Sequence, residues 1–316
     1  MLTFLQKKKC SLTIGLQLSE DNLSLLVLEH TSAGFPTVKH YVNYVIDRQN
    51  TLEMIKSEVR QFIEKQRLGM AACCLVLDDN DYQLLSVEAP PVADNEMAEA
   101  VRWKVKDLLS FPVSEAIIDV FLQQDGQVKG RRIANVVVVK KNIIDKKTTY
   151  IESLGLSLDA IDIPELVYRN YLERSDYRGK NIALVSLKKN YGKLVVLNMG
   201  EVYFSRSFSV NYKGGLLDDL PESDIVLELQ RSLDYYERQI KQIVPSDIVI
   251  MGENVIEDKI TGITTTSLNQ TVVISNMSDS VFAGYTFSDE DSLFSSRIIA
   301  SYGAALRQGL LEGARS

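Results

Sequence analysis

Side chains able to do catalytic or metal chemistry are few in this chain of 316 residues, and their spacing is unfavourable. Two of the three cysteines, Cys73 and Cys74, are adjacent, so the set fits neither a disulfide framework nor a spaced metal site. We expect them to be small buried hydrophobes in a reducing compartment. The two histidines, His30 and His40, lie in polar connecting sequence with no partner at ligand or triad spacing. The sequence therefore predicts no catalytic residue and no metal site.

Nucleotide and nucleic-acid signatures are also missing from the sequence. Gly179-Lys180 has no upstream glycine at phosphate-loop spacing, and no Gly-x-Ser-x-Gly elbow occurs. The 35 basic and 42 acidic residues give a formal net charge of −7, whereas a nucleic-acid-binding domain usually carries a basic surface. No apolar stretch reaches the length of a transmembrane helix. We expect a cytoplasmic protein that binds no nucleic acid.

The first quarter of the chain predicts the order β-β-β-α-β. Short apolar runs rich in β-formers predict the strands, and apolar residues at helical spacing predict an amphipathic helix over 51–67. The strands are expected at 12–18, 23–28, 41–46 and 72–77.

The same order of elements returns in the second half. The strands are expected at 182–187, 193–199, 202–207 and 248–251. A long helix with one continuous apolar stripe precedes the last of them, with Ser223 or Asp224 as its cap and Pro245 as its stop. Two widely separated copies of one pattern predict a duplicated lobe, and the cleft between such halves is the default ligand site.

A unit with a different pattern, β-α-β-β-α, lies between the two copies. Its strands and helices are expected at 84–88, 94–110, 116–122, 133–139 and 142–154, and a final helix is expected within 295–309. The predicted division is 1–83 for the N-terminal part of the first lobe, 84–155 for an inserted α+β subdomain, 156–180 for a helical return to the first lobe, 181–300 for the second lobe and 301–316 for a C-terminal helix.

Three segments resemble the PilM-type proteins of type IV pilus assembly, and in particular the branch that serves MSHA pilus biogenesis. They are AVRWKVKDLLSFPV at 100–113 with Glu115 and Asp119 after it, ELQRSLDYYE at 228–237 and YGAALR at 302–307. The resemblance spans nearly the whole chain. It implies an α/β fold of the actin-like type, with duplicated ribonuclease H-like lobes and an inserted small α+β subdomain.

The resemblance also implies a function. Proteins of this kind are cytoplasmic and peripheral to the inner membrane, so membrane association is indirect. We expect a non-catalytic scaffold of the pilus assembly platform that binds the cytoplasmic N-terminal peptide of a PilN-like bitopic inner-membrane protein, together with other pilus assembly components. In this family the inserted subdomain and the first lobe together take the partner's peptide.

Some members of the family bind ATP, but that site is eroded in this chain. Thr13 and Ser186 stand where the resemblance predicts the carboxylates that help place a magnesium ion. Lys188-Lys189 replaces small residues in a phosphate-binding turn, and Gly252-Glu253 stands where two glycines are expected. Because hydrolysis depends on the metal, we expect no enzymatic activity and no cofactor.

Four residues nevertheless match nucleotide-binding positions of the family: Gly15, Glu228, Arg231 and Gly252. They support an alternative in which the chain binds ATP with magnesium and hydrolyses it slowly. A purely structural explanation of Glu228 and Arg231 is an i,i+3 ion pair on an exposed helix face. A further alternative is the cytoplasmic part of a type II secretion L protein, which is expected to continue into a membrane span and a periplasmic domain, whereas this chain ends at Ser316.

The only tryptophan, Trp103, is the candidate partner-binding residue. The apolar stripe of its predicted helix includes Met97, Val101 and Val105, and a rotation of about 100° per residue puts Trp103 on nearly the opposite side. Two interpretations stand at this point. Trp103 either anchors a partner in a groove beside the inserted subdomain or packs against the neighbouring lobe.

Overall fold

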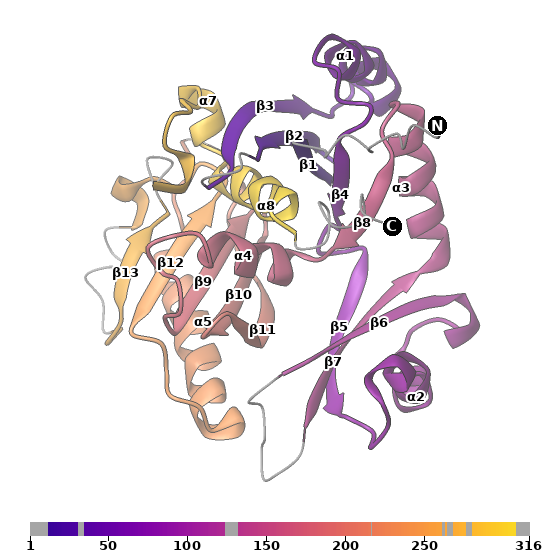
Figure 1. Ribbon diagram of the computed structural model, residues 1–316. Coiled ribbons are helices and arrows are strands. Elements are labelled where there is room, and N and C mark those ends of the chain that lie inside the picture. The colour runs from indigo at the N-terminus through magenta and orange to yellow at the C-terminus, as the bar shows by residue number, and fades with distance from the viewer. Residues whose placement is uncertain are drawn as a thin grey trace.

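Three β-sheets organise the described part of the chain (Figure 1). The computed structural model describes residues 12–30, 35–123, 132–215, 217–260, 263, 268–275 and 280–307. Two of the sheets have five strands and the third has three.

The first lobe is a mixed sheet with the order β3-β2-β1-β4-β8. Its strands are β1 (Leu12–Leu18), β2 (Asn22–Glu29), β3 (Thr37–Val45), β4 (Ala72–Val76) and β8 (Leu158–Asp162). Because side chains alternate along a strand, Ile14 and Leu16 of β1 pack in the cluster that holds α1 (Leu52–Lys65) and α3 (Lys141–Ser153). Thr13 and Gly15 therefore face the other side of the sheet.

The second lobe repeats this architecture. Its order is β11-β10-β9-β12-β13, and in both sheets the first three strands are antiparallel while the fourth and fifth run parallel to the first. The strands are β9 (Ile182–Lys188), β10 (Tyr191–Asn198), β11 (Glu201–Ser209), β12 (Asp247–Gly252) and β13 (Thr271–Ile274), and α5 (Glu222–Tyr235) covers the outer face. The predicted duplication of β-β-β-α-β is confirmed.

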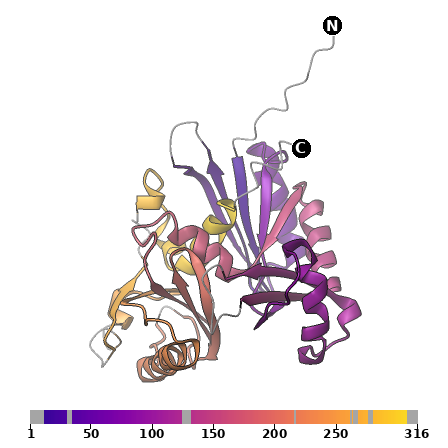
Figure 2. The same cartoon turned by 60° about the horizontal axis from the view of Figure 1, so that its bottom comes forward.

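Two helices, α4 (Pro164–Leu172) and α8 (Ser295–Ala305), fill the space between the two large sheets (Figures 1 and 2). Two glycines let α8 pack this closely. A Cβ on Gly15 would lie 1.7 Å from the carbonyl oxygen of Ser301, and one on Gly303 would lie 1.9 Å from that of Val167. The two large sheets and these helices thus share one continuous core.

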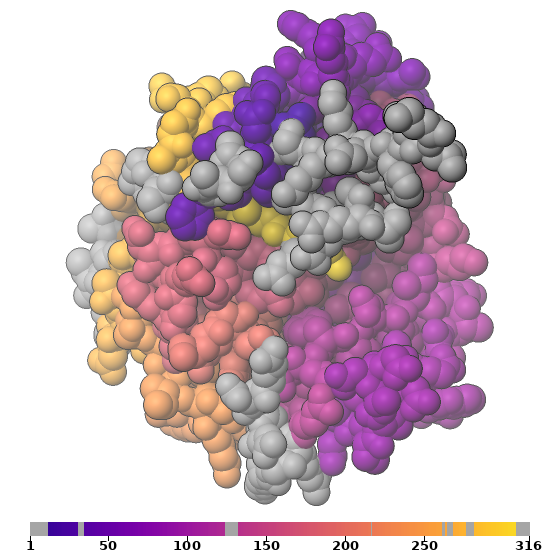
Figure 3. Space-filling view, viewed as in Figure 1, coloured from indigo at the N-terminus to yellow at the C-terminus, as the bar shows by residue number. Residues whose placement is uncertain are grey.

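The inserted subdomain is a three-stranded antiparallel sheet with the order β5-β7-β6, covered on one face by α2. Its elements are β5 (Tyr82–Glu88), α2 (Met97–Val105), β6 (Ala116–Leu122) and β7 (Ile133–Lys140). It stands beside the second lobe in the space-filling view (Figure 3). The Gln123 amide nitrogen joins the two, donating to the carbonyl oxygens of Val202 and Tyr203 at 3.3 and 3.1 Å.

The main differences from the expected elements lie in the return to the first lobe, at the edge of the second sheet and in α5. The segment 156–180, expected to be helical, begins with β8 before α4, and β13 completes the second sheet although no strand was predicted there. The α-helix α5 has Pro221 as its N-cap and ends at Tyr235. A π-helical turn follows it, and Lys241 then adopts a left-handed conformation, so the helix stops before Pro245 is reached.

Cys73, Cys74 and both histidines belong to the described residues, whereas Cys10 lies outside them. Cys73 and Cys74 are fully buried on opposite faces of the first sheet, and burial raises the pKa of the Cys73 thiol to about 12. The expectation of connecting sequence is wrong for His40, which lies in β3 with its ring edge against Phe62. His30 lies just after β2, with its Nε2 2.8 Å from the hydroxyl of Thr13.

Candidate functional site

An apolar groove of about 290 Å³ opens between the first lobe and the inserted subdomain. Strands β6 and β7 form one wall, and the end of β8 with the start of α4 forms the other. Its apolar side chains include Ile117, Phe121, Val137, Ile161 and Leu166. Because this lining is mostly branched and aliphatic, the groove suits apolar side chains of a ligand.

Two strand edges border the groove. Among the described strands, β8 pairs only with β4, and β6 pairs only with β7. Each strand therefore has one edge whose main-chain donors and acceptors are not used by another described strand. Such an edge can accept an extended peptide as an additional strand, while pockets beside it take alternate side chains of the peptide.

An ion pair between Arg307 and Asp162 adds a polar end to the groove. The guanidinium of Arg307 donates to the Asp162 carboxylate at 2.6 Å and to the carbonyl oxygen of Ile161 at 3.4 Å. Burial raises the pKa of Asp162, and Arg307 opposes that rise. Burial also acts to lower the pKa of Arg307, but the Asp162 carboxylate outweighs it and raises that pKa.

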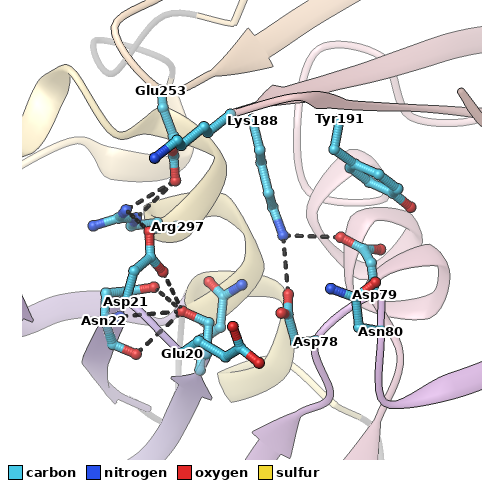
Figure 4. A pocket seen from close by; sticks show the side chains of 13 residues that line it. Glu20, Asp21, Asn22, Asp78, Asp79, Asn80, Lys188, Tyr191, Glu253 and Arg297 are labelled. Carbon is cyan, nitrogen blue, oxygen red and sulfur yellow. Dashed lines mark hydrogen bonds and ion pairs between the residues drawn. The ribbon is translucent and has the colours of Figure 1, made fainter. Parts of the chain in front are cut away.

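A second cavity, of about 340 Å³, lies in the cleft between the two lobes (Figure 4). The β1–β2 turn, the loop after β4 and the β9–β10 turn line it. The ammonium group of Lys188, at the end of β9, lies 2.9 Å from Asp79 and 3.4 Å from Asp78 in the loop after β4. The cleft is thus bridged by a lysine from the second lobe.

Behind this bridge, Lys193 of β10 is the centre of a buried polar cluster. Its ammonium group lies 2.6 Å from Asp79, 2.8 Å from Glu165 and 2.6 Å from the hydroxyl of Tyr82. Burial alone would raise the pKa of Asp79, but the ammonium groups of Lys188 and Lys193 outweigh it and hold the pKa far below its ordinary value. Burial would likewise lower the pKa of Lys193, but Glu165 and Asp79 raise it instead. Asp79 and Lys193 are therefore charged at neutral pH.

A second ion-pair cluster crosses the cleft at the start of α8. The guanidinium of Arg297 lies 2.8 Å from Glu253, which follows β12, and 3.3 Å from Asp21 in the β1–β2 turn (Figure 4). Arg297 is buried, and it contacts groups from both lobes. Ion pairs between a cation and carboxylates thus cross the cleft at two places.

Comparison with known proteins gives a fold but no sequence family. No protein-family model and no curated protein sequence matches this chain. Among solved structures, the PilM-PilN type IV pilus biogenesis complex matches with a TM-score of 0.73 and 16% identity, covering 93% of this chain and 98% of that chain. The cytoplasmic domain of EpsL, an inner-membrane component of the type II secretion system of Vibrio cholerae, matches with a TM-score of 0.55 and 12% identity, covering 95% and 100%.

The chain has the actin-like fold. The predicted α/β class, with two like lobes and an inserted subdomain, is therefore confirmed. No helix among the described residues combines the length and apolarity that crossing a bilayer requires. An actin-like fold hosts many functions, so the function has to be argued from the groove and the cleft.

The residues predicted to contact nucleotide do not gather in one place of this actin-like chain. Gly15 lies in the middle of β1 under α8, and Gly252 ends β12 beside the cleft. Glu228 and Arg231 do meet, at 2.7 Å, but on α5, which packs on the face of the second sheet opposite α8. Glu228 is also 3.0 Å from Arg206, so its carboxylate already holds two guanidinium groups.

Gln17 is a cleft residue that the sequence analysis missed. Gln17 lines the cavity near the β1–β2 turn, which is where a metal-binding residue of this strand would be expected. Thr13 lies four residues earlier, and its hydroxyl donates to the carbonyl oxygen of Ala305 at 2.7 Å. Both face α8, because alternate residues of a strand share a face. The side-chain oxygen of Gln17 is buried and accepts no hydrogen bond from the described residues.

These cleft residues fit a magnesium–triphosphate poorly. Gln17 carries no charge, and Asp78 and Asp79 are paired with Lys188. No group of three or more His, Cys, Asp or Glu side chains in the described part of the chain is placed to hold a metal ion. The two carboxylates nearest Lys188 are therefore already neutralised by an ammonium group, which leaves them poorly suited to hold magnesium.

Trp103 does not lie in the apolar groove. The α2 helix packs on Val136 and Val138, whereas Val137 and Val139, which point to the opposite face of the inserted sheet, line the groove. The Trp103 side chain is 68% exposed, and the ammonium group of Lys106 lies 5.5 Å from its ring centroid. A partner contact of Trp103 would therefore use a different face of the subdomain.

Proposed function

We propose that this chain is a non-catalytic, actin-like scaffold of a type IV pilus assembly platform, of the MshI type that serves MSHA pili. It binds the cytoplasmic N-terminal peptide of a PilN-like bitopic inner-membrane protein in the apolar groove. The observation that carries the proposal is the groove itself, an apolar channel bordered by the β6 and β8 edges. The likeness in fold to a structure of a PilM-PilN complex agrees with it.

The groove favours an extended ligand. A peptide strand alongside β8 or β6 would gain main-chain hydrogen bonds, and its alternate side chains would enter the space between Ile117, Val137 and Leu166. Apolar residues on every second position are therefore the expected recognition feature. Arg307 and Asp162 at the polar end would contact a polar group of the peptide.

This proposal places the protein in the cytoplasm, peripheral to the inner membrane, with the partner providing the anchor. Other pilus components would bind elsewhere on the surface, and the exposed Trp103 is one contact that we propose for them. The net charge of −7 disfavours binding to nucleic acid.

Two other functions remain as alternatives. The likeness to the EpsL cytoplasmic domain favours a type II secretion role, and the lower TM-score makes it the second choice. Binding of ATP with magnesium is the other, and the paired carboxylates of the cleft argue against it.

The test uses the full chain and a fluorescein-labelled synthetic peptide with the cytoplasmic N-terminal sequence of the PilN homologue from the same cell. Fluorescence anisotropy should show saturable binding. Ile117→Glu should weaken it by about ten-fold or more, because a carboxylate would be buried unpaired against the peptide. Ile117 is 40% exposed, so the variant should fold, and Ile256→Glu, at a site 36% exposed outside the groove lining, is the matched control. Equal binding by both variants would refute the groove as the site.

A further inference from the structure

We propose that Lys193 is a positioning residue for the groove, so that the second lobe controls how well the groove binds its peptide. This inference rests on the proposed function of the groove. Lys193 belongs to β10 and does not line the groove, yet each of its three contacts lies in a segment that carries a groove residue or pairs with a strand that does.

The three partners of Lys193 come from three different parts of the first lobe and the inserted subdomain. Asp79 lies in the loop after β4, Tyr82 begins β5, and Glu165 lies in the first turn of α4. The Tyr82 hydroxyl also donates to Glu165 at 2.6 Å, so the partners are connected to one another as well as to Lys193.

Each partner is a close neighbour of a groove residue. Leu77 precedes Asp79 by two positions, and Ile163 and Leu166 flank Glu165; all three line the groove. Tyr82 is the direct cross-strand partner of Val139, which also lines it. One ammonium group therefore fixes the base of both groove walls.

Burial makes this connection strong. Lys193 and Glu165 have side chains only 4% and 1% exposed, and that of Asp79 is 7% exposed. A buried charge that loses its partner keeps the cost of leaving water without the compensating attraction. A movement of the second lobe away from Lys193's partners must therefore either break these ion pairs, at a large cost in free energy, or displace the segments that carry the groove residues.

The experiment compares the parent chain with Lys193→Met and the matched control Lys189→Met, which changes an exposed lysine of the β9–β10 turn. Affinity for the same labelled PilN-homologue peptide is measured by anisotropy, and hydrogen–deuterium exchange is measured with and without the peptide. Lys193→Met should weaken binding by about 5- to 150-fold, the usual range of coupling between two sites, while Lys189→Met should bind like the parent.

Exchange provides a result that a loss of general stability would not produce. Coupling is reciprocal, so the peptide should slow exchange in the β9–β10 hairpin of the parent and not in Lys193→Met. Without peptide, β6 and β8 should exchange faster in Lys193→Met while β1 and β2 do not. If Lys193→Met does not fold, Tyr82→Phe, which removes only the hydroxyl contact, is measured instead, and a weaker effect of the same sign is expected.

The outcomes separate this inference from the proposed function. If the parent binds the peptide and Lys193→Met binds it equally, the coupling is refuted while the groove stands. If the parent does not bind, the proposed function fails. The exchange of β6 and β8 in the free protein then decides alone: faster exchange in Lys193→Met supports the coupling, and unchanged exchange refutes it.

Discussion

The ammonium group of Lys188 in the second lobe lies 2.9 Å from the carboxylate of Asp79 in the loop after β4. The ammonium group of a second lysine, Lys193, lies 2.6 Å from the other oxygen of Asp79. One carboxylate of the first half therefore holds two cations of the second half, inside the cleft where an actin-like ATPase would place phosphates and metal.

This arrangement predicts weak or no binding of Mg-ATP. Titration calorimetry of the parent with Mg-ATP should give no heat of binding at micromolar concentrations, because the Asp78 and Asp79 carboxylates that could hold magnesium are paired with Lys188. Micromolar binding that Glu228→Ala abolishes would instead support the ATP-binding alternative. It would also show that the ion pairs of the cleft do not prevent nucleotide binding.

Asp79→Asn should destabilise the protein by about 3–5 kcal/mol at neutral pH, since it leaves two buried or half-buried lysines short of a partner. Urea unfolding followed by circular dichroism measures this. Asp78→Asn is a milder comparison, because its contact with Lys188 is longer, at 3.4 Å, and Asp79 keeps that lysine paired. Equal stability of parent and Asp79→Asn would contradict the cluster's role.

The same carboxylate gives a pH dependence of known sign. The folded-state pKa of Asp79 lies far below its unfolded value of about 3.9, so its contribution to stability is present above that value and is lost as the pH falls towards the folded-state pKa. The stability difference between parent and Asp79→Asn should therefore be constant from neutral pH down to about pH 5 and shrink below about pH 4. A difference that grows on acidification would contradict the assignment.

Gly15→Ala should destabilise the chain by at least about 1–3 kcal/mol, because the new methyl group would overlap the Ser301 carbonyl and push α8 off the first sheet. Thermal unfolding is the measurement. Gly69→Ala is a suitable control, since a Cβ there would lie 3.4 Å from the nearest atom, the carbonyl oxygen of Gly155. If Gly15→Ala were as stable as Gly69→Ala, α8 could not pack against β1 as closely as described.

Trp103→Ala should leave both stability and peptide affinity nearly unchanged. The side chain is 68% exposed on the far side of the inserted sheet from the groove, and exposed substitutions usually change stability by less than about 0.5 kcal/mol. Thermal unfolding measures the stability of the variant, and fluorescence anisotropy measures its affinity for the peptide. A loss of peptide affinity of about ten-fold would instead show that Trp103 contributes to peptide binding.

Local pattern was sufficient to predict the repeated lobes, because each strand and helix has its own apolar periodicity. It failed where the decisive contact is distant in sequence. Lys193 lies in a strand where alternation predicts an exposed lysine, and only Asp79 and Glu165, brought in from the first half, explain why it is buried. The short β8 lacked a signal of its own, since Asp159 and Asp162 interrupt its apolar residues.

The candidate sites show the same difference between features that local pattern predicts and features that depend on contacts distant in sequence. Sequence reasoning expected a binding groove beside the inserted subdomain with Trp103 as a possible anchor, whereas the apolar groove has walls from β6, β7, β8 and α4 and does not include Trp103. For the metal-binding position of the first lobe it took Thr13, whereas Gln17, four residues further along the same face of β1, is the one that lines the cleft cavity. Alternation along a strand predicts which residues share a face of the sheet. Which of them reaches the cleft depends on where the strand ends and the β1–β2 turn begins.

The position of α8 has a consequence for synthesis on the ribosome. This helix is made after every strand of both sheets, yet it lies between them and contacts β1 and β12 as well as α4. Neither half can complete its interior until residues 295–305 have left the exit tunnel, so the nascent chain must wait with unfilled apolar surfaces. A chain stalled before this helix would be a natural substrate for chaperones.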